Sequence, residues 1–569
     1  MSLPWPQVAL AAWPTQSFTN LPVCDAPGTQ DSPRLIPDGA GGMFVAFHDL
    51  GGISGDVFVH HILSDASLAP GWPRNGRRVV NAASNQTSPA IIADGSGGLL
   101  VAWQDFRGGV SYDLYAHHVL ADGTLDPAWP VNGVPVCLAA GDQINLLAEP
   151  GDSGSMFLLW QDKRSSANDD LYAIRLLSNG SPAPGWPTEG LVVCDAAGLQ
   201  QQASMISDGS GGVYLAWQDG RDGSTNTQIV AQHLRPDGSL ASGWPVNGSV
   251  VCNAAGSQSA PALQSDRAGG ALMTWNDPRN ASTNTDVYAH HLLDLNGPDP
   301  GWPVNGLVVC DAPANQLGCK MVSDGAHGAI LAWGDNRGDG DIYAHHLLMN
   351  GSLDAAWPAQ GLAVCTAINP QGQTAIATDG NGGAIILWLD FRTTLNVSDL
   401  YAHHVTIAGV LDPAWPVNGT AVTTAPGTQA SQRLITDTAG GAIALWQDLR
   451  FGSEGDLYAQ RILANGTLGG DVVGVGPAPP SQLAFDVSPN PSRDGRLQLR
   501  FATALTASAR LELFDLSGRV VATQAIPSSS NATVEWQPRV PAGMYVIRLT
   551  RAGESHARRV LLLRPVGDR

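Results

Sequence analysis

Lysine is nearly absent from this chain of 569 residues, which contains only Lys163 and Lys320. Lysine and arginine together number 30 against 50 aspartates and glutamates, so the formal net charge is −20 at pH 7. A surface of this charge repels nucleic acids and anionic membranes, because both are negatively charged themselves. The composition therefore indicates that nucleic acid is not a partner.

Long apolar runs and helical patterns are also missing. No run of about 18 or more apolar residues occurs, so no transmembrane segment is expected. Met1–Gln7 has neither a charged start nor a long apolar core, so no signal peptide is predicted there. No stretch keeps a helical period, and no phosphate loop, nucleophile elbow or metal-protease motif is found. The sequence therefore lacks the common motifs by which these classes of enzyme are recognised.

Glycine and proline are abundant, with 66 and 39 residues, and they punctuate a repeat of about 57 residues. The repeat is anchored by an aromatic residue, any residue and an aspartate. The eight anchors are Phe47/Asp49, Trp103/Asp105, Trp160/Asp162, Trp217/Asp219, Trp275/Asp277, Trp333/Asp335, Trp388/Asp390 and Trp446/Asp448. A fixed period of this length is typical of a repeat architecture.

Each repeat is predicted to form four short strands. In the repeat from Ser257 to Cys310, apolar runs at Ser259–Gln264, Ala271–Trp275, Asp286–Leu293 and Leu307–Cys310 are separated by turn residues. Four strands in each of eight repeats predict an all-β fold, an eight-bladed β-propeller. An open solenoid is the structural alternative, because it also stacks identical units.

The ends of the repeat array favour a closed ring. A Trp-Pro element precedes the first repeat at Trp13, and no copy follows the last repeat, which ends near Leu468. The N-terminal strand Leu21–Cys24 could therefore complete the blade that contains Ile443–Trp446 and Asp456–Leu463. Closure would remove two open sheet edges. The propeller is assigned to residues 1–468 and is followed by a Gly/Pro linker at 469–482.

The seven cysteines are interpreted as small buried residues. Six of them occupy the same place in successive repeats, which puts them at least one blade apart and beyond disulfide reach. Cys319 departs from this pattern and is close in sequence to Cys310. The positions of the six equivalent residues are Cys24, Cys137, Cys194, Cys252, Cys310 and Cys365. No metal-type cysteine spacing is present.

Histidine pairs such as His290/His291 suggest zinc, but two observations favour a structural role. Neighbours on a strand point to opposite faces, so one pair cannot converge on one ion. Three repeats also replace the pair. The other pairs are His60/His61, His117/His118, His345/His346 and His403/His404, and the replacements are Ile174/Arg175, Gln232/His233 and Gln460/Arg461.

Acidic loops raise the question of Ca²⁺, which prefers carboxylate and carbonyl oxygens. In seven repeats an arginine follows the anchor aspartate by two residues, and in seven an aspartate begins the next strand. These are Arg107, Arg164, Arg221, Arg279, Arg337, Arg392 and Arg450, and Asp56, Asp113, Asp170, Asp286, Asp341, Asp399 and Asp456. We favour Asp–Arg pairs that fix the loops. The loop Asp335–Asp341 is the one most similar to a calcium site, and no cofactor is otherwise expected.

Catalysis requires different residues in defined roles, so an active site is expected where a repeat departs from the common pattern. The first repeat has Phe47-His48-Asp49 with no following arginine, and the fourth has Gln228 in place of an aspartate. In the third, Glu149 and Asp152 could serve acid–base chemistry, but sequence drift explains them as well. No catalytic or metal-binding residue is assigned, and the ligand-binding residues are left open.

The C-terminal residues 483–569 are predicted to form a separate small β-sandwich. Its strands are expected at Leu497–Phe501, Ala509–Asp515, Thr533–Trp536, Gly543–Thr550 and Arg558–Leu563.

Four blocks in this region follow in order: Ser488–Pro491, Leu511–Arg519, Pro541–Leu549 and Arg558–Val560. Together they resemble the C-terminal sorting domain of the type IX secretion system. This resemblance implies an immunoglobulin-like fold, contact with the secretion machinery, and export to the outer surface of a Gram-negative bacterium or release from it. The tail Pro565–Arg569 runs past the usual end of that family. The repeats themselves resemble uncharacterised exported bacterial propellers, a similarity that implies no activity.

Three functions are compatible with these observations. The first is a secreted or surface propeller that binds glycan or protein without catalysis. The second is an extracellular hydrolase or lyase that acts on polysaccharide in the central funnel. The third is a structural unit of a surface assembly. Convergent, non-repeating acids in the channel would favour the second, and regular contacts between copies the third.

Overall fold

The computed structural model describes most of the repeat region and part of the C-terminal region. The described residues are 13–52, 54–165, 168–281, 284–452, 454–469, 485–488, 492, 496–501, 508–514, 519–526, 533–551 and 554–562. Contacts divide the chain into two compact units, Met1–Asp471 and Val472–Arg569.

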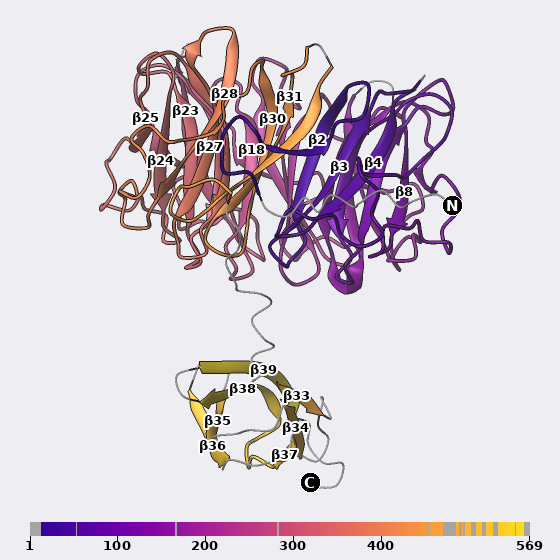
Figure 1. Ribbon diagram of the computed structural model, residues 1–569, viewed down its shortest axis with the longest axis vertical. Coiled ribbons are helices and arrows are strands. Elements are labelled where there is room, and N and C mark those ends of the chain that lie inside the picture. Colours follow the sequence, from indigo (N-terminus) through magenta and orange to yellow (C-terminus); the bar gives the residue numbers. More distant parts are fainter. Residues whose placement is uncertain are drawn as a thin grey trace, which may run out of the picture. The chain divides into compact units, whose positions relative to one another are not determined.

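Four-stranded antiparallel sheets make up the first unit (Figure 1). The first four are β2 (Gln30–Pro37), β3 (Met43–Asp49), β4 (Asp56–Ile62) and β5 (Arg77–Arg78); β6 (Gln86–Ala93), β7 (Leu99–Asp105), β8 (Asp113–Val119) and β9 (Val134–Cys137); β10 (Gln143–Pro150), β11 (Met156–Asp162), β12 (Asp170–Leu176) and β13 (Leu191–Cys194); and β14 (Gln200–Ser207), β15 (Val213–Asp219), β16 (Gln228–Leu234) and β17 (Ser249–Cys252).

The remaining sheets of this unit continue the same order. They are β18 (Ser259–Ser265), β19 (Ala271–Ala281), β20 (Asn284–Leu292) and β21 (Leu307–Cys310); β22 (Gln316–Ser323), β23 (Ala329–Asp335), β24 (Asp341–Leu347) and β25 (Leu362–Cys365); β26 (Gln371–Thr378), β27 (Ala384–Thr394), β28 (Val397–Val405) and β29 (Thr420–Thr423); and β30 (Gln429–Thr436), β31 (Ala442–Asp448) and β32 (Asp456–Ile462) with β1 (Leu21–Cys24). The expectation of an all-β propeller is confirmed.

The first strand of each sheet lies innermost. Each of these strands contacts the first strands of the sheets on either side, and β2 contacts β30, so the inner strands form a closed ring around a central channel. Figure 1 shows β2 and β30 near each other although they come from opposite ends of the unit. The outer strand β1 pairs with β32, with Leu21 opposite Ala459. The last sheet is thus built from both ends of the repeat array.

The core lies between neighbouring sheets, and the second strand of each sheet supplies much of it. In β15, every residue from Val213 to Asp219 is buried, and the anchor Trp217 is completely buried. Such a strand is covered on both faces, which explains its continuous apolar run. Aspartates make the turns that follow the inner strands: the Asp38 Oδ1 accepts hydrogen bonds from the Ala40 and Gly42 amides at 2.7 and 2.9 Å.

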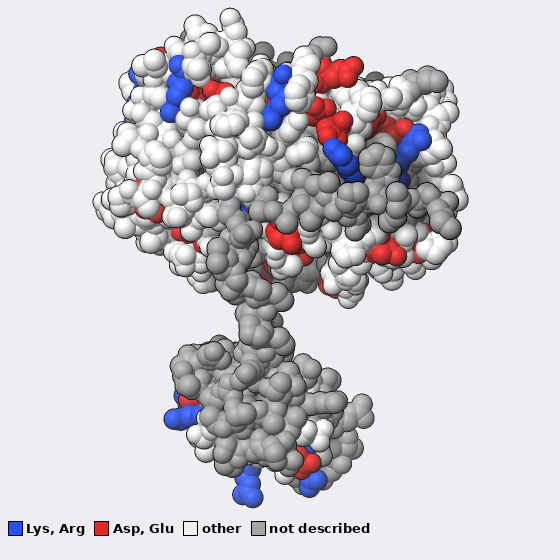
Figure 2. Space-filling model, in the orientation of Figure 1, with Lys and Arg blue, Asp and Glu red and all other residues white. Residues whose placement is uncertain are grey.

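The surface of the first unit carries little charge. On the face drawn in Figure 2, acidic and basic side chains stand in small groups among uncharged residues. Only 14% of the chain is charged, in agreement with this picture. No helix among the described residues is long and apolar enough to cross a membrane.

The second unit contains two antiparallel sheets in its described part. They are β33 (Phe485–Ser488), β34 (Leu497–Phe501) and β37 (Thr533–Trp536), and β36 (Val520–Ile526), β35 (Ala509–Phe514), β38 (Gly543–Arg551) and β39 (Glu554–Leu562). One core joins the sheets, because Leu499 and Trp536 cluster with Leu511 and Ile547. The sequence predicted five of these strands and missed β33 and β36. The immunoglobulin-like topology stays a prediction.

Candidate functional site

A β-bulge interrupts each inner strand at the same repeat position. In β14 the register with β15 shifts between Gln201 and Ser204, and Gln202 adopts a left-handed conformation with φ of 51°. A bulge of this kind turns a side chain away from its regular direction. The left-handed residues are Ser32, Ser88, Asn145, Gln202, Ala260, Gly318, Gln373 and Ser431. Since these strands surround the channel, the bulges form a ring of irregular positions along its wall.

A glutamine at the start of each inner strand fixes the turn that precedes the strand. The buried Gln30 donates from Nε2 to the carbonyl oxygens of Ala26 and Gly28 at 3.1 and 3.0 Å. The other seven are Gln86, Gln143, Gln200, Gln258, Gln316, Gln371 and Gln429. Because they repeat in every sheet, these residues belong to the framework rather than to a ligand site.

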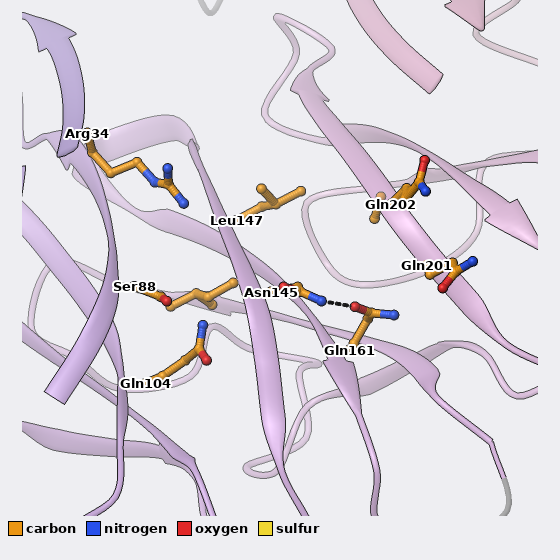
Figure 3. Close-up of a pocket in the computed structure, with 10 residues that line it drawn as sticks. Arg34, Ser88, Gln104, Asn145, Leu147, Gln161, Gln201 and Gln202 are labelled. Carbon is orange, nitrogen blue, oxygen red and sulfur yellow. Dashed lines mark hydrogen bonds between the residues drawn. The ribbon is translucent and has the colours of Figure 1, made fainter. Parts of the chain in front are cut away.

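A cavity of about 350 Å³ lies in the channel against the first four sheets (Figure 3). Arg34 reaches into it from β2, and the amides of Gln104, Asn145, Gln161 and Gln202 surround it. Ser88, Leu146, Leu147, Gln201 and Ala203 complete the lining. Figure 3 shows Arg34 extending toward Leu147 and a hydrogen bond from Asn145 to Gln161. Gln161 also donates from Nε2 to the Gln200 carbonyl at 2.7 Å, which ties β11 to the next sheet. The lining is uncharged apart from Arg34, and it combines amide side chains with the apolar Leu146, Leu147 and Ala203.

Sequence reasoning did not find this cavity. Its lining residues come from a few equivalent places in four repeats, and Gln104 and Gln161 occupy the same place, between the anchor tryptophan and aspartate. The bulge position is polar in six of the eight repeats and is Ala260 or Gly318 in the other two, so the available signal was weak: three successive repeats carry the polar residues Ser88, Asn145 and Gln202 there. Ring geometry then brings them together.

The first sheet adds a histidine–aspartate pair found at no equivalent place in the other described sheets. His48 Nδ1 lies 3.0 Å from Asp31 Oδ1, which joins β3 to the inner strand β2. Burial opposes ionisation of Asp31, but the hydrogen bond and charge of His48 prevail and lower its pKa. The departure noted in the sequence at Phe47-His48-Asp49 therefore lies beside the channel.

The anchor aspartates are enclosed by their own repeat. Asp277 is fully buried; its Oδ2 accepts from Trp275 Nε1 at 2.8 Å and from Arg279 Nη2 at 2.5 Å. Its Oδ1 accepts from the backbone amide and Nε of Arg279, both at 3.0 Å. The Arg279 guanidinium also lies 3.8 Å from the centre of the Tyr288 ring. A carboxylate with so many donors is occupied within its own repeat, which supports the interpretation of Asp–Arg pairs as loop anchors.

The loop most similar to a calcium site has its acids engaged separately. Asp335 binds Trp333 and Arg337, and Asp339 accepts from the Asn369 amide at 3.1 Å. Burial, together with the charges of Asp339 and Asp335, raises the pKa of Asp341. No cluster of metal-ligating side chains is present among the described residues. A calcium requirement stays an open prediction that chelation can test.

The strand-opening aspartates carry an electrostatic cost that can be measured. Burial, together with the charges of the nearby Asp25, Asp448 and Glu454, raises the pKa of Asp456 to about 6. The folded state therefore binds the proton more tightly than the unfolded chain. The resulting stabilisation is complete below the unfolded pKa near 3.8 and is lost as pH rises through about 6.

We expect Asp456→Asn to raise the melting temperature at pH 8 and to lose that advantage at pH 3.5, because the charge repulsion is absent when the carboxyl is protonated. Gln228, the neutral residue at this place in β16, shows that an amide fits. Thermal denaturation across this pH range is the measurement, with Asp65→Asn on an exposed turn as the matched control. An advantage of equal size at both pH values would contradict the explanation.

Each histidine pair divides into two different environments. His291 bridges two carboxylates, with Nε2 2.9 Å from Asp266 Oδ2 and Nδ1 2.9 Å from Asp299 Oδ2. Burial works against protonation, but these contacts raise its pKa. Its neighbour His290 has its pKa lowered by burial and stacks on Trp302, with ring centroids 5.8 Å apart. His291 also packs on Trp302, so one tryptophan holds both rings.

Replacement of the second histidine keeps the same contact. In the last sheet Arg461 donates from Nε and Nη2 to Asp437 Oδ2 at 2.9 and 2.8 Å. In the third sheet Arg175 pairs with Asp152. The shared requirement is thus a nitrogen-bearing side chain that ties the third strand to the turn aspartate, in agreement with a structural role for the pairs.

Glu149 and Asp152, the two acids of the third repeat, lie in different surroundings. Glu149 lies on the inner strand β10, where burial raises its pKa to about 7. Asp152 belongs to the short 3-10 helix Asp152–Gly154 and pairs with Arg175. The structure therefore links Asp152 to the sheet framework and leaves Glu149 on the channel wall.

All seven cysteines are buried and free. Burial raises the pKa of the Cys252 thiol to about 12. Its Sγ lies 3.2 Å from Arg279 Nη2, within the anchor described above. A buried, protonated thiol is a poor nucleophile, so the cysteines pack as small apolar residues.

Comparison with protein families identifies the second unit. The secretion system C-terminal sorting domain family matches residues 486–562. The blocks that suggested this resemblance in the sequence are thereby confirmed. The chain carries a sorting tail for the type IX secretion system, and the protein is exported to the cell surface or secreted. No curated protein is similar to the chain in sequence.

Solved structures with related folds are distant. A protein of unknown function from Dyadobacter fermentans is 9% identical over 79% of this chain and 97% of its own, with a TM-score of 0.33. The α-L-arabinofuranosidase Arb93A of Fusarium graminearum is 11% identical over 56% and 92%, with a TM-score of 0.28. PorZ, a surface component of the Porphyromonas gingivalis type IX secretion system, is 11% identical over 92% and 79%, with a TM-score of 0.20. At these values the similarities carry no information on ligand or activity.

Proposed function

We propose that the protein is an exported binding propeller whose first unit holds a saccharide in the central channel. The observation that carries this proposal is the channel cavity of about 350 Å³, which is lined by Arg34, by several amide side chains and by two leucines. Ligand cavities in proteins usually have volumes of about 300–1,000 Å³. The sorting tail supplies the delivery to an extracellular site.

The lining has the chemistry of a hydroxyl-rich ligand. Gln104, Asn145, Gln161 and Gln202 carry amide groups, and a sugar hydroxyl can both donate to and accept from such groups. Some of this capacity is used within the protein, because Asn145 donates to Gln161 and the Gln202 carbonyl accepts from the Ala260 amide. Leu146 and Leu147 supply an apolar patch against which the carbon face of a sugar ring can pack. This combination supports saccharide binding.

The same lining favours binding over hydrolysis. Glycoside hydrolysis commonly needs two carboxylates that flank the scissile bond. None of the residues that surround the cavity is acidic. Glu149 occupies the same inner strand as Asn145 but lies outside the lining, and Asp152 is held by Arg175. The hydrolase alternative would need a second carboxylate near Glu149.

The proposal is tested by titrating the full chain with a panel of oligosaccharides and by comparing Gln202→Ala with Gln373→Ala. Both glutamines occupy the left-handed bulge position, but only Gln202 lines the cavity, and Ala260 shows that alanine adopts this conformation. We expect roughly 3- to 10-fold weaker binding for Gln202→Ala, since one neutral hydrogen bond contributes about 1 kcal/mol. Gln373→Ala should bind like the wild type.

Equal affinity of the two variants would place any saccharide outside the cavity and overturn the proposal. Failure of every saccharide to bind would overturn it as well. Sedimentation of the full chain would then show whether regular self-association supports the alternative of a surface assembly.

A further inference from the structure

The channel wall reverses the charge balance of the molecule. The whole chain has 50 acidic and 30 basic residues. The eight inner strands, all of which are described, instead hold three basic residues, Arg34, Lys320 and Arg433, and two acidic ones, Asp31 and Glu149. The three basic residues occupy one and the same repeat position, two residues after the bulge. The positive charge is therefore concentrated at one level of the channel.

Both acidic residues are already neutralised or engaged. Asp31 is hydrogen-bonded to His48 across β2 and β3 at 3.0 Å. Burial raises the pKa of Glu149 to about 7, so a large share of its carboxyl groups is neutral at neutral pH. Neither supplies a free carboxylate to the arginines.

Arg34 and Arg433 lie on the neighbouring strands β2 and β30, which close the inner ring. Most arginines of the first unit pair with a carboxylate, as Arg279 does with Asp277. In the described structure Arg34 and Arg433 have none. Arg34 Nε donates to the Pro89 carbonyl at 3.1 Å, and Arg433 Nη1 donates to the Gln432 carbonyl at 2.9 Å.

The two guanidinium groups are close enough to repel each other. Burial and the charge of Arg34 together lower the pKa of Arg433 to about 10. Burial alone lowers the pKa of Arg34. Two half-buried cations without a counter-charge destabilise the folded state, and a bound anion would remove that cost. Guanidinium groups also match planar or tetrahedral oxyanions through paired N–H donors.

We propose that Arg34 and Arg433 form an oxyanion site in the channel that binds the carboxylate or sulfate group of an acidic saccharide. This inference rests on the proposed function and refines its ligand class. Arg34 is shared with the cavity, so the charged group lies beside β2 and the sugar hydroxyls lie against the amides of β7, β10 and β14. The narrow, positively charged channel would also attract such a ligand out of solution.

The test compares the full-length wild type with Arg34→Gln/Arg433→Gln. The matched control is Arg77→Gln on β5, because Arg77 Nε also donates to a backbone carbonyl, that of Gly123, and Arg77 forms no ion pair within the described part of the chain. The probes are a galacturonic acid trisaccharide, a sulfated galactan oligosaccharide, uncharged cellotriose and sodium sulfate alone, each titrated by calorimetry at low salt. The first two probes distinguish carboxylate from sulfate.

We expect at least one acidic saccharide to bind about tenfold or more tightly than cellotriose, a difference that charge-assisted hydrogen bonds commonly provide. The double variant should lose that preference, because its affinity for the acidic saccharides falls far more than its affinity for cellotriose, and Arg77→Gln should change neither affinity. Added sodium chloride should weaken only the acidic ligands.

Each other result is also decisive. If cellotriose binds as tightly as the acidic saccharides, or if the double variant retains the preference, the oxyanion site is overturned and the proposed function stands. If sodium sulfate binds to the wild type but not to the double variant, and no saccharide binds, the anion site stands while the proposed function and the saccharide ligand fall.

Discussion

Val23→Asp is expected to remove a large part of the stability of the first unit. Val23 is only 2% exposed, and it belongs to a cluster that joins the first and last sheets through Val45, Leu445 and Leu457. An aspartate there would bury an unpaired charge within β1, the N-terminal strand that completes the last sheet. The cost of an uncompensated buried charge is about 3–5 kcal/mol, a large fraction of the ~5–15 kcal/mol that stabilises a typical protein.

Urea denaturation followed by tryptophan fluorescence measures this effect, since the anchor tryptophans are buried in every sheet that has one. The matched control is Val192→Asp on β13, which is also an outer strand, but where the valine is 41% exposed. We expect the control to change stability by less than about 0.5 kcal/mol. Equal denaturation midpoints for Val23→Asp and the wild type would show that β1 contributes little to the stability of the ring.

Asp277→Ala is expected to have the second large effect. Removal of this buried carboxylate would leave the Arg279 guanidinium and the Trp275 indole N–H without their acceptor. Breaking a buried pair by removing one partner costs about 3–5 kcal/mol, because the other charge stays buried. Asp195→Ala, at an exposed residue next to a strand end, is the control and should be close to neutral.

A second variant separates the ion pair from simple loss of packing. Asp277→Asn/Arg279→Met keeps an acceptor for Trp275 and removes both charges, so it should recover part of the lost stability.

The wild type should melt at the same temperature with calcium and with chelator if the anchors are fixed by arginine. A fall in melting temperature under chelation, absent in Asp277→Ala, would assign a cation to this site instead.

The positions of most strands could be predicted from the sequence, because apolar runs bounded by glycine, proline and aspartate recur at a fixed spacing. Leu307–Cys310 was predicted with its observed bounds, and β20 begins two residues before the expected Asp286. Strand β36 was missed since only Ile526 of its seven residues is buried, and the strand has no alternating apolar pattern.

The candidate site could not be predicted in the same way. The bulges place serine, asparagine and glutamine in left-handed conformations, and no glycine marks them except Gly318. Residues such as Arg34, Asn145 and Gln202 are brought together only by closure of the ring, which is a contact between repeats rather than a pattern within one. Repetition predicts the framework well, but a ligand site depends on the positions where the repeats differ.

The pairing of β1 with β32 has a consequence for how the molecule matures. Asn20 and Gln460, which are hydrogen-bonded in the closing sheet, are separated by 440 residues. A nascent chain folds from its N-terminus, so the earlier sheets must wait with an open edge until the final repeat is synthesised. The sorting tail follows that repeat directly in the chain. The last repeat, which allows the ring to close, and the sorting tail, which directs export, are therefore synthesised at nearly the same time.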